Sequence, residues 1–265
     1  MCSIAEKRLF LFDMDGTIYL DDDVFDGTLD LLGLIKEIGG RYLFLTNNSS
    51  KSTDKYVEKL CRMGIPAKKD DFLTSADAAV RYLKTHPHRK IYVFGTKSFR
   101  EQLSDAGLPV TDKLSDDIDM LCMGFDTELT FGKLEDACIL LGRNVDYIAT
   151  NPDWVCPTRY GYVPDCGSVS EMLFRAAGRY PKFIGKPEPE MVFMALESTG
   201  FSKDEAVLIG DRLYTDIACG NAADIDTVFV LSGEGTEADL EKSEVKPTFV
   251  RKNVRAIFNE FKKAR

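Results

Sequence analysis

Short apolar runs alternate along the chain with segments whose apolar residues recur at the three- and four-residue spacing of a helix. Leu29–Ile38 is such a helical segment, and the glycine pair that follows it is a typical helix stop. The alternation predicts an α/β fold with parallel strands. The runs that we expect to be strands are Arg8–Asp13, Arg41–Thr46, Lys90–Gly95, Asp119–Gly124, Asp146–Thr150, Glu205–Asp211 and Asp226–Leu231.

The first run leads straight into two acids. Asp13 and Asp15 follow Leu9–Phe12, and a glycine and Thr17 come next. In a parallel sheet covered on both faces, ligands bind beyond the carboxyl ends of the strands. This placement favours a reactive turn, although Asp-Gly after an apolar run is also typical of a hairpin.

The second run ends in hydrogen-bonding side chains. Thr46, Asn47 and Asn48 follow one another and precede two serines. Hydroxyl, amide and loop N–H groups near a helix N-terminus suit phosphate oxygens. The same residues could equally be a polar cap for a helix that starts at Thr53.

Two later segments carry further charges. Lys186 follows a short apolar run, and Pro187 is expected in the first turn of a helix, although an isolated lysine is usually a surface charge. Asp211 ends the apolar run at 206–209, and Asp216 lies five residues further on. Converging acids without histidines or paired thiols suit a hard cation such as Mg²⁺.

Composition narrows the function classes. The chain has 265 residues, of which 44% are hydrophobic, so it can bury a substantial core. Its net charge of −9 argues against nucleic acids and anionic membranes as partners, and no apolar stretch approaches the ~20 residues of a membrane span.

We expect a cytoplasmic protein whose seven cysteines, none in a CxxC pair, are reduced. With only two histidines, His86 and His88, a catalytic triad or zinc site is disfavoured.

The motifs in this order resemble those of the haloacid dehalogenase superfamily, and longer strings are similar to its NagD and p-nitrophenyl phosphatase branch. The resemblance covers nearly the whole chain. It rests on Asp13–Tyr19, Thr46–Ser49, Thr150–Asp153, Asp165–Ser168, Ile184–Pro187 and the Asp211–Asp216 pair.

The resemblance implies a Rossmann-like three-layer α/β/α core with a parallel sheet and an inserted α/β cap domain of the C2 type. Motif spacing locates the insertion, because only 30 residues separate Asp15 from Thr46, whereas 139 separate Thr46 from Lys186. We therefore assign residues 1–74 and 181–265 to the catalytic core and residues 75–180 to the cap, which would set substrate specificity.

The resemblance also implies a metal site and a mechanism. Mg²⁺ would be held by the Asp13 side chain, the Asp15 backbone carbonyl and Asp211, with Asp216 acting directly or through water. Asp13 would be the nucleophile that forms an aspartyl phosphate, and Asp15 would protonate the leaving oxygen and later deprotonate water. A cation is needed because like charges about 4 Å apart repel by roughly 4 kcal/mol at an effective dielectric of 20.

Lys186 and Thr46 would complete the catalytic set. By resemblance, Lys186 neutralises the phosphate, while Thr46, Asn47 and Asn48 bind phosphoryl oxygens and Thr17 orients its loop. In the cap, the candidate substrate contacts are Asp153, Tyr160 and Pro164–Gly167, which could equally be ordinary loop residues.

The sequence therefore predicts a Mg²⁺-dependent phosphatase for small phosphate monoesters, such as p-nitrophenyl phosphate, a nucleotide or a sugar phosphate. A homodimer through the cap is also expected. A phosphomutase or phosphonate hydrolase is disfavoured, because in this superfamily those activities usually need a cap in the gap that is short here. A catalytically silent phosphate-binding protein on the same fold is the alternative from another class.

Overall fold

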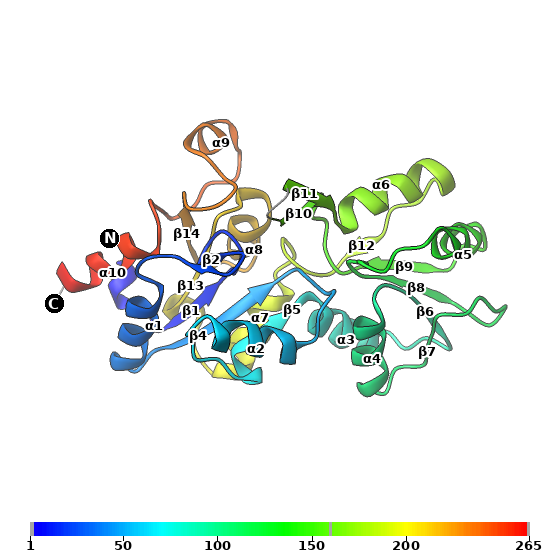
Figure 1. Ribbon diagram of the computed structural model, residues 1–265, viewed down its shortest axis with the longest axis horizontal. Coiled ribbons are helices and arrows are strands. Elements are labelled where there is room, and N and C mark those ends of the chain that lie inside the picture. The colour runs from blue at the N-terminus through cyan, green and yellow to red at the C-terminus, as the bar shows by residue number, and fades with distance from the viewer. Residues whose placement is uncertain (1–2, 159–160, 264–265) are drawn as a thin grey trace. The chain divides into compact units, whose positions relative to one another are not determined.

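The computed structural model describes residues 3–158 and 161–263, which are divided between two compact units (Figure 1). The first lies within Met1–Thr46, Val57–Leu73 and Lys186–Arg265, and the second within Asn47–Tyr56 and Thr74–Gly185. The α/β fold is confirmed in both. The helices of the described residues include none that is both long and apolar enough to cross a membrane.

The first unit is built on a six-stranded sheet in the order β15-β14-β13-β1-β4-β5. The strands from β15 to β4 pair in parallel, with β1 in the middle between β13 and β4. The apolar side chains of β1, β4, β13 and β14 are buried because helices flank the sheet. The bounds of the strands are β1 (Leu9–Phe12), β4 (Arg41–Thr46), β5 (Phe72–Thr74), β13 (Ala206–Gly210), β14 (Asp226–Val230) and β15 (Phe249–Arg251).

The other elements with residues in the first unit include a hairpin of β2 (Tyr19–Leu20) and β3 (Asp23–Val24), and helix α2 begins in the second unit and ends in the first. Short helices are η1 (Ile4–Glu6), η2 (Lys69–Asp71), η3 (Lys203–Glu205) and the π-helix η4 (Leu213–Ile217). The α-helices are α1 (Thr28–Glu37), α2 (Thr53–Arg62), α7 (Glu190–Thr199), α8 (Ala218–Ala222), α9 (Glu237–Lys242) and α10 (Val254–Lys263).

The second unit has its own parallel sheet and its own core. Five strands lie in the order β12-β9-β8-β6-β7, and Phe94, Leu121 and Leu140 belong to the apolar cluster that packs on them. The strands are β6 (Ile91–Phe94), β7 (Val110–Thr111), β8 (Met120–Met123), β9 (Asp146–Ala149) and β12 (Lys182–Phe183), with a hairpin of β10 (Val155–Thr158) and β11 (Gly161–Pro164). The helices are α3 (Ser75–Thr85), α4 (Lys97–Asp105), α5 (Phe131–Gly142) and α6 (Cys166–Ala177).

The division differs in detail from the sequence assignment of 1–74, 75–180 and 181–265. The second unit extends to Gly185 and also takes in Asn47–Tyr56, which follow β4. Hydrogen bonds explain this, because Ser49 Oγ accepts from the Phe125 backbone N–H at 2.9 Å and lies 2.9 Å from Thr150 Oγ1. The loop after β4 is thereby anchored to the second sheet.

The expected strands are confirmed to within one residue at each end, and Leu29–Ile38 matches α1. The expectation that Pro187 starts a helix is wrong, because α7 begins at Glu190 with Pro189 as its N-cap. Glu188 precedes a proline, and the proline ring disfavours the helical conformation in the residue before it. The helix therefore cannot extend back through Glu188.

One testable consequence concerns the packing of α8 on β14. A Cβ added at Gly220 would lie 2.2 Å from Thr227 Cγ2, whereas one added at Gly33 in α1 would meet nothing within 4 Å. We expect Gly220→Ala to lower the free energy of unfolding by about 1–3 kcal/mol through overpacking, and Gly33→Ala to raise it by up to about 1 kcal/mol through helix propensity. Urea unfolding of both variants checks this, and equal effects would contradict the close contact.

Candidate active site

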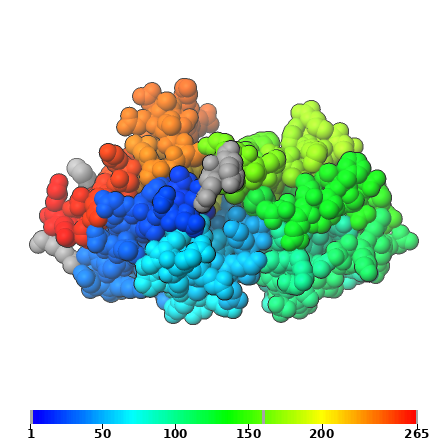
Figure 2. Space-filling view, viewed as in Figure 1, coloured from blue at the N-terminus to red at the C-terminus, as the bar shows by residue number. Residues whose placement is uncertain are grey.

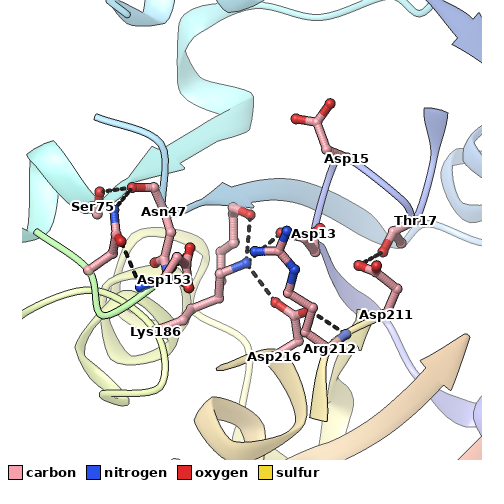
Figure 3. Close-up of polar contacts among 12 residues, drawn as sticks. Asp13, Asp15, Thr17, Asn47, Ser75, Asp153, Lys186, Asp211, Arg212 and Asp216 are labelled. Carbon is pink, nitrogen blue, oxygen red and sulfur yellow. Dashed lines mark hydrogen bonds and ion pairs between the residues drawn. The ribbon is translucent and has the colours of Figure 1, made fainter. Parts of the chain in front are cut away.

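Three carboxylates gather at the carboxyl edge of the first sheet (Figure 3). Asp13 follows β1 and Asp211 follows β13, and because these strands are parallel neighbours, their ends meet. Asp216 comes from the π-helix η4, which starts two residues after Asp211. One oxygen from each of the three carboxylates lies within 4.8 Å of the others.

Lys186 lies among these acids. Its Nζ donates to Asp13 Oδ1 at 2.5 Å, to Asp216 Oδ1 at 2.7 Å and to the Leu45 carbonyl oxygen at 3.2 Å. The side chain is 2% exposed, so the interpretation of Lys186 as a surface charge is wrong. Burial by itself lowers the pKa of Lys186, but the charges of Asp13 and Asp216 outweigh it and raise that pKa, so the amine is protonated.

The carboxylates influence one another. Burial raises the pKa of Asp13 well above its usual range, and Asp216 and Asp211 raise it further, while Lys186 acts in the opposite direction. Burial and the charge of Asp216 likewise raise the pKa of Asp211 to about 6. Mutual repulsion of this kind is what a bound cation relieves.

One backbone donor and one hydroxyl donor hold the Asp211 carboxylate in place. The Glu234 backbone N–H donates to Asp211 Oδ2 at 2.7 Å, and Thr17 Oγ1 donates to Asp211 Oδ1 at 3.4 Å. A Cβ at Gly233 would lie 2.0 Å from Asp211 Oδ2, and one at Gly16, where φ is +88°, would lie 2.5 Å from it. Glycines at these positions let two loops approach the carboxylate.

Asp15 stands apart from the three acids. Its side chain is 39% exposed and points away from them in Figure 3. The Tyr19 hydroxyl donates to Asp15 Oδ2 at 3.3 Å, and Lys59 Nζ lies 3.8 Å from Asp15 Oδ1. Of the two aspartates in the motif, Asp13 therefore lies in the acidic cluster, whereas Asp15 is accessible to solvent.

Thr46 ends β4 and is buried. Asn48 belongs to a local turn, because its Oδ1 accepts from the Ser50 backbone N–H at 3.0 Å and from Ser50 Oγ at 2.7 Å. The Tyr56 hydroxyl donates to the Asn48 carbonyl oxygen at 3.1 Å. The Asn48 side chain is therefore engaged in a local turn before α2.

Asn47 is held within the second unit. Its Nδ2 donates to Asp153 Oδ2 at 3.2 Å and lies 3.4 Å from Asp153 Oδ1, and both side chains are buried. Nearby, Asp165 Oδ1 accepts from the Cys166 backbone N–H at 2.6 Å. Burial and the charge of Asp153 raise the pKa of Asp165 to about 7. Tyr160, another expected substrate contact, lies outside the described residues.

The cysteines at positions 61, 122, 138, 156, 166 and 219 form no disulfide among the described residues, and their reduced state stays a prediction. Cys2 lies outside the described residues.

Comparisons with known proteins identify the family. Residues 10–109 match a family model described as haloacid dehalogenase-like hydrolase, and residues 183–257 match one described as HAD-hydrolase-like. An acid sugar phosphatase of Staphylococcus epidermidis is 34% identical over 97% of this chain and 98% of its own length. The chain belongs to the haloacid dehalogenase superfamily.

Solved structures place this haloacid dehalogenase protein in the NagD and p-nitrophenyl phosphatase branch. A 4-nitrophenylphosphatase from Thermotoga maritima is 39% identical with a TM-score of 0.90, over 97% of this chain and 98% of that one. A glycerol phosphate phosphatase from Mycobacterium tuberculosis, crystallised with magnesium, is 30% identical with a TM-score of 0.91, over 99% of this chain and 80% of that one. The predicted enzyme class, a phosphatase, is confirmed.

The raised pKa of Asp165 predicts a pH-dependent stability. Between about pH 4 and 7 the folded protein binds a proton at Asp165 that the unfolded chain releases. The stabilisation is fully present below pH 4 and is lost as the pH rises to 7. Relative to Asp165→Asn, the wild-type free energy of unfolding should fall by on the order of 2–4 kcal/mol over this range.

Urea unfolding in EDTA at several pH values checks this difference. Asp146→Asn, at an exposed acid in the same unit, is the control and should run parallel to the wild type. Parallel curves for Asp165→Asn as well would show that Asp165 titrates normally.

Proposed function

We propose that this phosphatase hydrolyses small phosphate monoesters with the help of Mg²⁺ and through a phosphorylated Asp13. The observation that carries the proposal is the contact of Asp13 with the buried Lys186, beside Asp211 and Asp216. It combines a carboxylate nucleophile, a fixed positive charge for the phosphate and oxygen ligands for a cation. The substrate class includes p-nitrophenyl phosphate, nucleotides and sugar phosphates.

The donor set suits Mg²⁺. Asp13, Asp211 and Asp216 supply hard carboxylate oxygens within 4.8 Å of one another. Mg²⁺ prefers oxygen ligands that include only a few carboxylates, and it binds them at short metal–oxygen distances. The Asp15 backbone carbonyl oxygen is proposed as a further Mg²⁺ ligand. Asp216 is proposed to bind the ion either directly or through a water molecule. When bound, the ion neutralises charge on the carboxylates and the phosphate so that the two anions can approach.

The chain's own residues perform the reaction in two steps. Asp13 attacks phosphorus, the ester P–O bond breaks, and Asp15 gives its proton to the leaving oxygen. Water then attacks phosphorus, Asp15 takes its proton, and inorganic phosphate leaves while the Asp13 carboxylate is regenerated. Asp15 accepts a hydrogen bond from the Tyr19 hydroxyl and lies 3.8 Å from Lys59 Nζ, so these two groups compete with the substrate for its carboxyl group.

Phosphate binding is assigned to the residues around Lys186 and the end of β4. Lys186 neutralises phosphoryl charge, and Thr46, Asn47 and Asn48 offer hydroxyl, amide and backbone donors. The second unit is proposed to be the cap that selects the substrate. A homodimer through this unit and a cytoplasmic location stay predictions.

Metal removal tests the proposed cofactor. Exhaustive chelation with EDTA should abolish turnover of p-nitrophenyl phosphate, and Mg²⁺ should restore it. Ca²⁺ should restore less, because it demands longer bonds and more ligands. Asp211→Asn should lower activity at least ~10-fold, whereas Asp70→Asn, at an exposed acid of the first unit, should change nothing. Full activity after chelation would refute the metal role.

A second experiment separates the roles of the two leading acids. Asp13→Asn should abolish turnover of every ester, because a neutral amide cannot form the phosphoenzyme. Asp15→Asn should retain part of the first step with p-nitrophenyl phosphate, whose leaving group needs little protonation, but should hydrolyse the intermediate slowly. Rapid-quench analysis of this variant should then show a phenolate burst.

The phosphorylated site can be identified directly. The Asp15→Asn protein should carry acid-stable, hydroxylamine-sensitive phosphate on Asp13. A burst from Asp13→Asn, or label on another residue, would show that the two roles are wrongly assigned.

A further inference from the structure

Two of the clustered carboxylates in the first unit are each held by a backbone N–H group. The Glu234 N–H donates to Asp211 Oδ2 at 2.7 Å, and the Arg212 N–H donates to Asp216 Oδ2 at 3.1 Å (Figure 3). The two donors come from different segments, because Arg212 follows β13 whereas Glu234 lies in the loop after β14. The spacing of the two carboxylates therefore depends on how these segments are held together.

The side chains of the same two donor residues meet. Arg212 Nε lies 2.8 Å from Glu234 Oε2, and the side chains are 13% and 32% exposed. The Tyr214 hydroxyl also donates to Glu234 Oε1 at 3.4 Å. An ion pair that is partly withdrawn from water is screened less than an exposed one. One side-chain contact thus joins the two residues whose backbones hold Asp211 and Asp216.

The loop that carries Glu234 is anchored on both sides of this residue. Ser232 Oγ donates to the Gly16 carbonyl oxygen at 2.8 Å, and the Gly235 N–H donates to the Asp211 carbonyl oxygen at 3.1 Å. A Cβ added at Gly235 would lie 2.5 Å from that carbonyl oxygen. The backbone of the loop thus lies against Asp211, and the Glu234 side chain extends this connection to the segment that starts η4.

We propose that the Arg212–Glu234 ion pair is a positioning device for the metal ligands, which fixes the separation of Asp211 and Asp216 before Mg²⁺ binds. The inference rests on the proposed Mg²⁺ site and adds two positioning residues to it. When the pair is broken, part of the binding free energy is used to bring the carboxylates together, so the observed affinity falls. In the Mg²⁺-loaded protein the ligands are already in place, so kcat should be nearly unchanged.

Through-space electrostatics alone makes a different prediction. The negative charge of Glu234 attracts a cation, and the positive charge of Arg212 repels it. On that basis Glu234→Gln would weaken Mg²⁺ binding, whereas Arg212→Gln would strengthen it. Positioning requires both variants to bind Mg²⁺ more weakly, because either one breaks the ion pair.

Calorimetric titration with Mg²⁺ alone separates the two explanations, using protein freed of metal with EDTA and then dialysed. Glu234→Gln and Arg212→Gln should each weaken Mg²⁺ binding ~10-fold. The double variant has the wild-type net charge, and its affinity should stay as low as that of the single variants. Tighter binding by Arg212→Gln, an unchanged affinity in either single variant, or wild-type affinity in the double variant would overturn the proposal.

A second ion pair of the first unit supplies a matched control. Arg251 Nε lies 2.7 Å from Glu260 Oε2, and these side chains are 26% and 31% exposed. Glu260→Gln breaks this pair in the same way and should leave the Mg²⁺ affinity at the wild-type value. An equal loss of affinity in this control would mean that the effect is a general loss of stability, and the proposal would be wrong.

Steady-state kinetics distinguish positioning of the metal ligands from contact with the substrate. In both single variants the Mg²⁺ concentration for half-maximal activity should rise, while kcat at saturating Mg²⁺ should stay within about twofold of wild type. If Arg212→Gln instead raises KM for p-nitrophenyl phosphate and leaves Mg²⁺ binding unchanged, Arg212 binds the substrate and the positioning role is refuted.

The proposed function can fail separately. If the wild type binds Mg²⁺ but hydrolyses no ester, the function is wrong, and the Mg²⁺ titrations still decide the role of the ion pair. If the wild type binds no Mg²⁺, the positioning role itself is wrong.

Discussion

The buried ion pairs of Lys186 are the interaction on which the rest of the active site depends. Its ammonium group bonds Asp13 and Asp216 together with the carbonyl oxygen of Leu45, so one charge joins the ends of β1 and β4 to the π-helix η4. Opposite charges at about 4 Å attract by roughly 4 kcal/mol at an effective dielectric of 20. Without this ammonium, the three carboxylates, whose oxygens lie within 4.8 Å of one another, would repel more strongly and take up protons more readily.

Sequence reasoning located the strands with long apolar runs but missed the short ones. β1 and β13 are continuous apolar segments because both faces of the sheet are covered. Such runs can be recognised in the amino-acid sequence alone. β5 and β15 have three residues each, and β12 has two, too few for any periodicity. They are strands because tertiary pairing at a sheet edge holds them, which a local pattern does not encode.

The residues of the candidate site also fall into those that the sequence could predict and those that it could not. Asp13, Lys186 and Asp211 could be predicted, because their side chains carry the chemistry and stand at strand ends. The Glu234 backbone N–H and the close approach of Gly233 could not, since a backbone donor has no residue type of its own. The burial of Asp165 also depends on packing that the sequence does not reveal.

The central place of β1 has a consequence for synthesis on the ribosome. Leu9 pairs with Arg41 on one side and with Ala206 on the other. The middle of the first sheet therefore cannot form until nearly 200 residues after Leu9 have been synthesised. Domains fold largely as units during translation, and the inserted unit ends at Gly185, before β13 emerges. Asp13, the proposed nucleophile, is among the first residues made, yet Asp211 and Asp216 reach it only when most of the chain has been translated.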